Sequence, residues 1–169
     1  MEVSKRLSLQ LEGISLTPTS LRGICKTLEE SKQWMSGILP ENNPDGLNYA
    51  VFTRPETSES SEPMMIGIVG VHRPFPKAEL GYIYHPSSWG QGYATEALAA
   101  FLKLFWELRS GVETMEAYTD YENYASMKVL TKCGFHETRR LKEEALILTK
   151  GPEKRDVVMF EIKAPVALY

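Results

Sequence analysis

The sequence predicts a mixed α/β fold in a single domain, and three observations lead to that prediction. Short runs rich in β-branched and aromatic residues recur along the chain and are separated by glycine and proline turns. Two segments, residues 94–108 and 123–133, instead repeat apolar side chains every three or four positions, as buried helices do. The order is several strands, a helix, a strand, a helix and two strands. That order is typical of a mixed sheet with one central crossover helix.

The first part of the chain is expected to form three strands and one helix. Residues 6–11 alternate polar and apolar side chains, which is the pattern of a half-buried strand. Residues 27–38 have helical spacing and end at a glycine and a proline. A strand over residues 47–53 is followed by a polar loop over residues 54–63. Residues 64–72 form an apolar run that predicts a largely buried strand.

The second part begins with a strand that is expected to pair antiparallel with its predecessor, because a short proline turn joins the two. A helix follows, with apolar positions from Ala94 to Leu108, and it breaks at Ser110 and Gly111. The second helix ends at Gly134, a residue suited to a helix C-terminus. The remaining strands are expected over residues 79–84, 112–119, 135–140 and 156–162.

The loop that starts the central helix, Trp-Gly-Gln-Gly-Tyr-Ala at residues 89–94, is the first candidate binding site. Glycines let the backbone turn without a Cβ penalty, and the N–H groups of a helix start attract anions. Taken alone, the same residues also fit a plain turn. Two known phosphate loops are excluded, because neither the Walker pattern nor the dinucleotide-binding glycine pattern is present.

Composition narrows the class of protein. Nineteen basic and 22 acidic residues give a net charge of −3, and no basic run favours binding to nucleic acid or to an anionic membrane. Cys25 and Cys133 are too few for a disulfide framework, and the three histidines show no metal-ligand spacing, so we expect no metal. No apolar run reaches membrane-spanning length. These features predict a cytoplasmic protein, with the nucleus as an alternative.

Two long motifs carry a family resemblance. Residues 79–97, ELGYIYHPSSWGQGYATEA, and residues 117–135, AYTDYENYASMKVLTKCGF, resemble the GNAT acyltransferases, and most closely the branch typified by the ribosomal-protein alanine N-acetyltransferases. The resemblance covers roughly residues 26–162. It implies a mostly antiparallel sheet, splayed at the cofactor strand, in one N-acetyltransferase domain over residues 1–169.

The resemblance also implies acetyl-CoA as acyl donor and a primary amine as acceptor. The glycine loop would hold the pyrophosphate, and the splayed strand would pair with the pantetheine arm as an added strand does. On that resemblance the residues that bind acetyl-CoA are Tyr82, Ile83, Tyr84, Trp89, Gly90, Gln91, Gly92, Tyr93, Ala94, Thr95, Asn123 and Ser126. Asn123 and Ser126 have an alternative role, since either suits the start of a helix without any ligand.

The chemistry needs a base for the amine, a donor for the oxyanion and a proton source for the thiolate. Glu79 is the candidate base, although an exposed carboxylate at a strand end would look the same in the sequence. A backbone N–H near Ile83 is expected to meet the oxyanion. Many relatives carry a tyrosine acid where this chain has Leu130, so Ser126, one helical turn earlier, is the candidate for that role. Tyr118 and Tyr124 are weaker candidates.

The N-terminal region departs from the family pattern. Roughly 16 residues separate the first strand from the first predicted helix, where relatives have a longer segment that walls the acceptor site. Three functions therefore stand: an N-acetyltransferase acting on a protein N-terminus or a small-molecule amine, an inactive acyl-CoA-binding domain, or an unrelated phosphate-ligand domain. The chain is expected to be a monomer or a homodimer.

Overall fold

A computed structural model describes residues 7–11, 27–36, 41–54, 62–71, 74, 77–146 and 152–165. It contains seven strands, three α-helices and one short 3-10 turn within those residues. The strands are β1 (Leu7–Leu11), β2 (Leu47–Thr53), β3 (Met65–Val71), β4 (Ala78–Tyr84), β5 (Thr114–Asp120), β6 (His136–Leu146) and β7 (Lys154–Lys163). The helices are α1 (Leu28–Ser36), α2 (Tyr93–Leu108) and α3 (Tyr124–Lys132), with the turn η2 at Pro86–Ser88.

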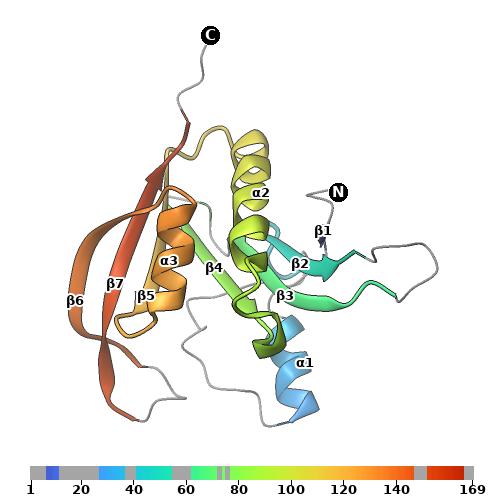
Figure 1. Cartoon of the computed structure of the whole chain (residues 1–169), viewed down its shortest axis with the longest axis horizontal. Coiled ribbons are helices and arrows are strands. Elements are labelled where there is room, and N and C mark those ends of the chain that lie inside the picture. The colour runs from blue at the N-terminus through green and yellow to red at the C-terminus, as the bar shows by residue number, and fades with distance from the viewer. Residues whose placement is uncertain are drawn as a thin grey trace.

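All seven strands belong to one sheet in the order β1-β2-β3-β4-β5-β7-β6. The strands pair antiparallel except β4 and β5, which are parallel because the crossover helix α2 connects them. Figure 1 shows α2 and α3 lying over the same face of this sheet. The predicted fold class, a mixed and mostly antiparallel sheet with a central crossover helix, is confirmed.

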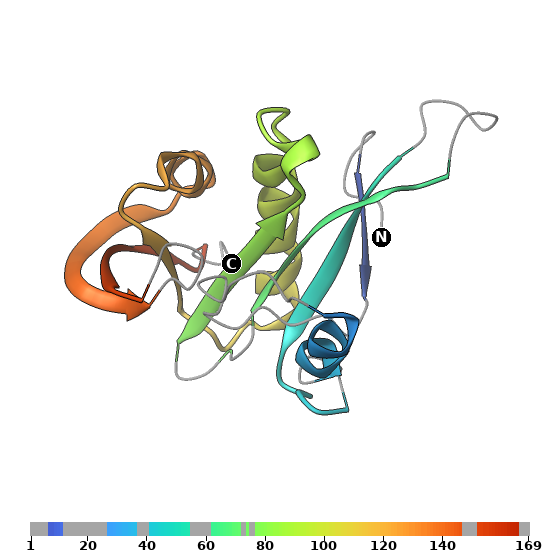
Figure 2. The same cartoon turned by 90° about the horizontal axis from the view of Figure 1, so that it is seen from below.

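The sheet opens between its two middle strands. The parallel register of β4 with β5 runs only from Ala78 to Leu80, opposite Met115 to Ala117. Beyond Leu80 the strands diverge, and Figure 2 shows β4 rising on one side and β5 turning away toward α3 on the other. The predicted splay is therefore present, and it leaves the last part of β4 without a β5 neighbour.

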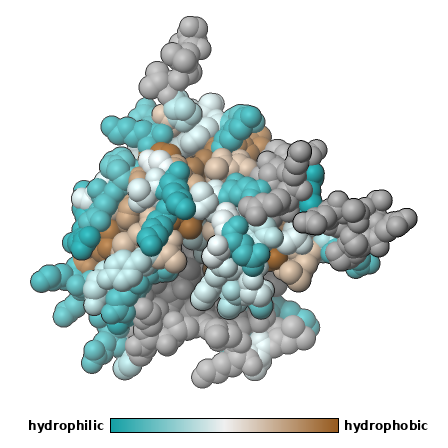
Figure 3. Space-filling view, viewed as in Figure 1, coloured by the Kyte–Doolittle hydropathy of each residue, from teal (hydrophilic) through white to brown (hydrophobic). Residues whose placement is uncertain are grey.

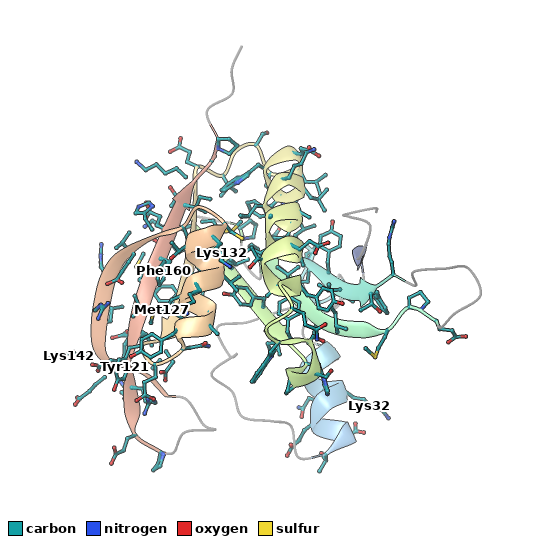
Figure 4. All side chains as sticks on the ribbon, viewed as in Figure 1. Lys32, Tyr121, Met127, Lys132, Lys142 and Phe160 are labelled. Carbon is teal, nitrogen blue, oxygen red and sulfur yellow. The ribbon has the colours of Figure 1, made fainter. Side chains whose placement is uncertain are left out.

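The main core lies between α2 and the sheet. Phe101 and Phe105 of α2 are fully buried, and the ring of Phe101 meets that of Tyr49 of β2 edge to face at 6.1 Å. α3 adds a smaller contact: its Met127 packs on the cluster that contains Phe160 of β7, and both residues are labelled in Figure 4. The apolar stripe predicted for α2 is confirmed at its centre, but Leu108 is 49% exposed and does not belong to it.

Several boundaries differ from the predicted ones. β6 continues to Leu146 rather than ending at residue 140, because it pairs with β7 from Glu161 back to Lys154, with a register shift between Leu141 and Ala145. Its side chains are mostly exposed, and the left side of Figure 3 shows many teal groups with brown patches among them, so no regular apolar alternation marked its second half. The strand predicted over residues 112–119 is β5, which runs from Thr114 to Asp120. Val112 is buried but lies before its first residue. In α3, Ala125 is exposed and only Leu130 is fully buried.

Some predictions fall outside the described residues. These concern Arg6, the short N-terminal region at 12–26 with Cys25, the end of the first helix at 37–40, most of the polar loop, and His72 with Arg73. None of the described helices has the length and hydropathy needed to cross a bilayer.

Candidate functional site

The loop between β4 and α2 owes its shape to two glycines with a left-handed backbone. Gly90 has φ 73° and Gly92 has φ 82°, a region that L side chains rarely adopt. A Cβ built on Gly90 meets no atom within 4 Å, so this glycine is required by its backbone angle and not by crowding. Gly92 is the N-cap of α2 and provides no side-chain hydrogen bond to the helix start. The helix start is therefore bare of side-chain caps.

The first turn of α2 directs its N–H groups at this loop. The amide of Glu96 bonds to the Gly92 carbonyl at 3.1 Å and begins the helical ladder, so the amides of Ala94 and Thr95 precede it. The partial positive charge of a helix N-terminus concentrates at these groups. Gln91 braces the loop through its side-chain amide, which donates to the Ser87 carbonyl at 2.7 Å. The result is a fixed backbone cradle of the kind that suits a phosphate.

Trp89 ties the loop to the end of β4. Its indole N–H donates to the Tyr84 carbonyl at 2.9 Å, while 67% of the residue surface stays exposed. The loop and the last residue of the strand therefore keep a fixed relation to each other. Trp89 presents an apolar ring to solvent directly beside the bare start of α2.

Hydrogen bonds to β3 establish which backbone groups of β4 face the opening in the sheet. The amide of His85 donates to the Ile66 carbonyl of β3 at 2.8 Å. Backbone groups alternate sides along a strand, so Ile83, two residues earlier, also directs its N–H to β3. The N–H groups of Tyr82 and Tyr84 therefore point away from β3, toward the opening where β5 no longer pairs with β4 beyond Leu80.

Asn123 is the N-cap of α3. Its side-chain oxygen accepts from the Ser126 amide at 3.1 Å, which is the capping role that the sequence offered as an alternative to ligand binding. Asn123 is also exposed, so capping leaves its amide group on the surface at the splayed edge.

Replacing Asn123 with alanine separates its two roles. Loss of the cap is expected to lower the free energy of unfolding by about 1 kcal/mol. A residue that also touches acetyl-CoA would in addition lower the affinity for it, whereas a pure cap would not. Chemical denaturation and calorimetric titration with acetyl-CoA measure the two effects. Aspartate at this position keeps the cap and serves as the control.

Ser126 lies in the first turn of α3 and bonds to a tyrosine of the splayed strand. The Tyr82 hydroxyl is 2.6 Å from Ser126 Oγ and also donates to the Ser126 carbonyl at 3.3 Å. Burial raises the pKa of Tyr82 to about 12, and the bond to Ser126 opposes that rise. The pair spans the opening between β4 and α3, on the face of the sheet that the helices cover.

Two further polar groups lie beside this pair. The hydroxyl of Tyr84 is buried and has no hydrogen-bond partner, alone in that respect among the side chains described. The Cys133 thiol donates to the Thr95 carbonyl at 3.5 Å and so links α3 to the first turn of α2. Burial raises the pKa of Cys133 to about 11, which keeps this thiol protonated at neutral pH.

Glu79 projects from the opposite face of the sheet. It pairs in register with Glu116 of β5, and side chains on β4 alternate faces, so Glu79 and Tyr82 point to opposite sides. Glu116 is buried, forms an ion pair with Lys77 and accepts from the Tyr118 hydroxyl at 3.2 Å. Burial, followed by the Glu116 charge, raises the pKa of Tyr118 to about 12.

The structure thus brings together the glycine loop, the end of β4 and the start of α3 around one opening in the sheet. Tyr118 shares the face of Glu79 and not that of Ser126, and Tyr124 is 65% exposed at the start of α3. Sequence reasoning missed the side-chain role of Tyr82, which it treated only as backbone. Its position two residues after the buried Leu80 could have placed it on the helix face.

Within the described ranges, no group of three or more His, Cys, Asp or Glu side chains could hold a metal ion. The site geometry offers backbone amides, hydroxyl groups and the two carboxylates of Glu79 and Glu116 near the splayed edge.

Comparisons with known proteins agree on one family. A model described as an acetyltransferase (GNAT) domain matches residues 16–136. The fold is similar to an acetyltransferase of the GNAT family from Bacillus anthracis, at TM-score 0.69 and 22% identity, covering 85% of this chain and 78% of that one. It is also similar to the spermidine N-acetyltransferase of Vibrio cholerae in complex with CoA and spermine, at TM-score 0.71 and 18% identity, covering 95% and 97%.

A third similar structure is Mycobacterium smegmatis RimJ in complex with CoA-disulfide, at TM-score 0.68 and 22% identity, covering 88% of this chain and 69% of that one. No curated protein matches the sequence.

Proposed function

The chain belongs to the GNAT acetyltransferase family, and on that premise we propose that it transfers an acetyl group from acetyl-CoA to a primary amine. The acceptor is a protein N-terminus or a small-molecule amine. The observation that carries the proposal is the open edge of β4, which lies directly beside the bare N-terminus of α2. A strand edge and an anion cradle together suit one ligand that carries both amide groups and a pyrophosphate.

The residues present fit acetyl-CoA. The amides of Ala94 and Thr95, with the backbone of Gly90 and Gly92, would hold the pyrophosphate, and each favourable contact of charge with helix dipole is typically worth about 0.3 to 1 kcal/mol. The edge of β4 at Tyr82, with the N–H of Tyr84, would pair with the amides of the pantetheine arm, while the Tyr84 carbonyl already accepts from Trp89. The remaining predicted contacts are Ile83, Trp89, Gln91, Tyr93, Asn123 and Ser126.

We assign the base to Glu79. An amine with a pKa above neutrality must lose a proton before it attacks, and a carboxylate reached directly or through water removes it. Glu79 lies at the start of β4 on the face opposite α2 and α3, one residue before β4 and β5 diverge. The amine would therefore approach the splayed edge from that face.

Ser126 is assigned to the leaving thiolate. It lies on the helix-covered face, so the base and the proton source flank the opening from opposite sides. Overall the protonated amine loses two protons, one before it attacks and one as the amide forms, while the thiolate gains one and the other is released to solvent. The N–H of Tyr82 or of Tyr84 would donate to the oxyanion. These two residues flank Ile83, and their N–H groups face the opening, whereas the N–H of Ile83 faces β3.

The experiment that tests the proposal measures thiol release from acetyl-CoA with a panel of primary amines and N-terminal peptides. Turnover on at least one acceptor supports it. Binding of acetyl-CoA by calorimetry without turnover on any acceptor would instead support an inactive acyl-CoA-binding domain. Failure to bind acetyl-CoA would reject both.

We further propose a single domain over residues 1–169, cytoplasmic or nuclear, that works as a monomer or homodimer without nucleic acid or membrane.

Gly92→Val tests the loop assignment. Valine does not tolerate φ 82°, so the loop must shift and its amides leave the cradle. Affinity for acetyl-CoA is expected to fall about 10-fold, equivalent to the 1 to 2 kcal/mol cost of a left-handed L residue. Calorimetric titration measures it. Gly111→Val is the matched control, because Gly111 has a φ outside the positive region, no crowding and a position at the far end of α2. Unchanged affinity in Gly92→Val would contradict the assignment.

A further inference from the structure

We propose that Tyr82 is a positioning residue: its hydroxyl donates to Ser126 Oγ and so leaves the serine proton directed toward the departing sulfur of the acyl donor. This inference rests on the proposed function. The two oxygens are 2.6 Å apart, the shortest distance that the structure gives for either side chain.

The direction of the bond follows from the acidity of the partners. A phenol, even with its pKa raised to about 12, is a stronger acid than an aliphatic alcohol, so Tyr82 is the better donor. The second contact agrees with this direction. The Ser126 carbonyl, 3.3 Å from the same hydroxyl, can only accept, so one tyrosine proton is shared between two acceptors of Ser126. The hydroxyl proton of Ser126 is then not used by Tyr82.

The fold holds both residues rigidly enough for this role. The Tyr82 side chain is half-buried and packs against the main core, and its ring lies 6.1 Å from that of Tyr84. Ser126 is fixed from the other side, since its amide donates to the Asn123 side chain. A serine hydroxyl alone can rotate among three staggered positions. The hydrogen bond that Ser126 Oγ accepts from Tyr82 restricts this rotation. Tyr82 lies on β4 just past Leu80, where the splay begins.

A double-mutant cycle on kcat tests the inference. Tyr82→Phe and Ser126→Ala are each expected to lower kcat about 10-fold, because a thiolate with a pKa near 8.5 needs only modest help to leave. The double variant should also be about 10-fold slower, since both changes remove the same oriented proton. The KM for acetyl-CoA should change much less than kcat in each variant. Tyr121→Phe is the matched control, because it removes an exposed hydroxyl that bonds only to the neighbouring Glu122.

Losses that multiply to about 100-fold in the double variant would overturn the inference and leave the proposed function intact. A rise in KM without a change in kcat would also overturn it, because Tyr82 would then serve binding alone. Absence of turnover by the wild-type protein on every acceptor rejects the proposed function and this inference together.

A second variant keeps the test available if Tyr82→Phe does not fold. Replacing Tyr82 with 3,5-difluorotyrosine retains the ring and hydroxyl but makes the phenol much more acidic. The variant should lose kcat as the pH rises through the new phenol pKa, since a phenolate cannot donate to Ser126. Wild-type protein should not lose kcat over the same range, because its Tyr82 has a pKa of about 12. Identical pH profiles for the two proteins would overturn the inference.

Discussion

Glu79→Gln is expected to lower kcat by about 100-fold while the affinity for acetyl-CoA stays unchanged. Glutamine keeps the size of the side chain at the start of β4 but cannot take a proton from the amine. The proposed donor site lies along the splayed edge and on the helix-covered face, whereas Glu79 projects from the other face. Steady-state thiol release and calorimetric titration measure the two quantities separately.

Glu107→Gln is the control for this prediction, because Glu107 is an exposed residue near the far end of α2. It removes one negative charge from the protein without touching the sheet. If Glu79→Gln keeps more than half of the wild-type kcat, Glu79 is not the base. Glu116→Gln is then the next variant, since Glu116 pairs with Glu79 in register and lies on the same face.

Arg155→Ala is expected to lower the free energy of unfolding by about 3 kcal/mol, the low end of the cost of breaking a buried ion pair. Arg155 of β7 bonds through Nε to Asp120 at 2.7 Å, and the Asp120 side chain is only 7% exposed. Arg155 also pairs with Glu122 and covers the ring of Tyr121, which Figure 4 labels and which lies in the turn between β5 and α3. Without the guanidinium, Asp120 is left as a buried charge.

Arg140→Ala is the matched control. Arg140 bonds to Glu137 through two nitrogens, but the two side chains are 69% and 39% exposed, so the loss should be below about 1 kcal/mol. Urea denaturation at neutral pH compares both variants with the wild type. An Arg155→Ala protein within 1 kcal/mol of the wild type would show that water or a neighbour satisfies Asp120.

The order and type of the elements could be predicted because each carries a local signal. The central helix α2 has apolar residues at helical spacing, and Gly134, with φ 92°, follows the end of α3 as expected. The extent of β6 could not be predicted in the same way. Its residues from Arg139 to Glu144 are mostly exposed, so no burial pattern marks them, and their conformation depends on pairing with β7, which follows later in the chain.

The candidate site likewise has parts that a local sequence pattern reveals and parts that depend on long-range contacts. The glycine loop could be found from the sequence because the left-handed backbone at Gly90 and Gly92 requires glycine. The bond between Tyr82 and Ser126 could not, because it joins residues 44 positions apart across the splay. The relation of Glu79 to Glu116 is equally long-range and depends on the parallel register. Such pairings are set by tertiary packing and leave no local pattern.

The short parallel ladder between β4 and β5 has a thermodynamic consequence. Backbone pairing at this seam covers only three residue pairs, with β1 to β4 on one side and β5 to β7 on the other. A ligand that binds the folded chain at 100 times its Kd adds about 2.7 kcal/mol to its stability. If acetyl-CoA pairs with the free edge of β4, amide hydrogen exchange should slow first along this seam. The bound acyl donor then stabilises the contact between the two halves of the sheet. Each release of CoA returns the protein to its less stable state.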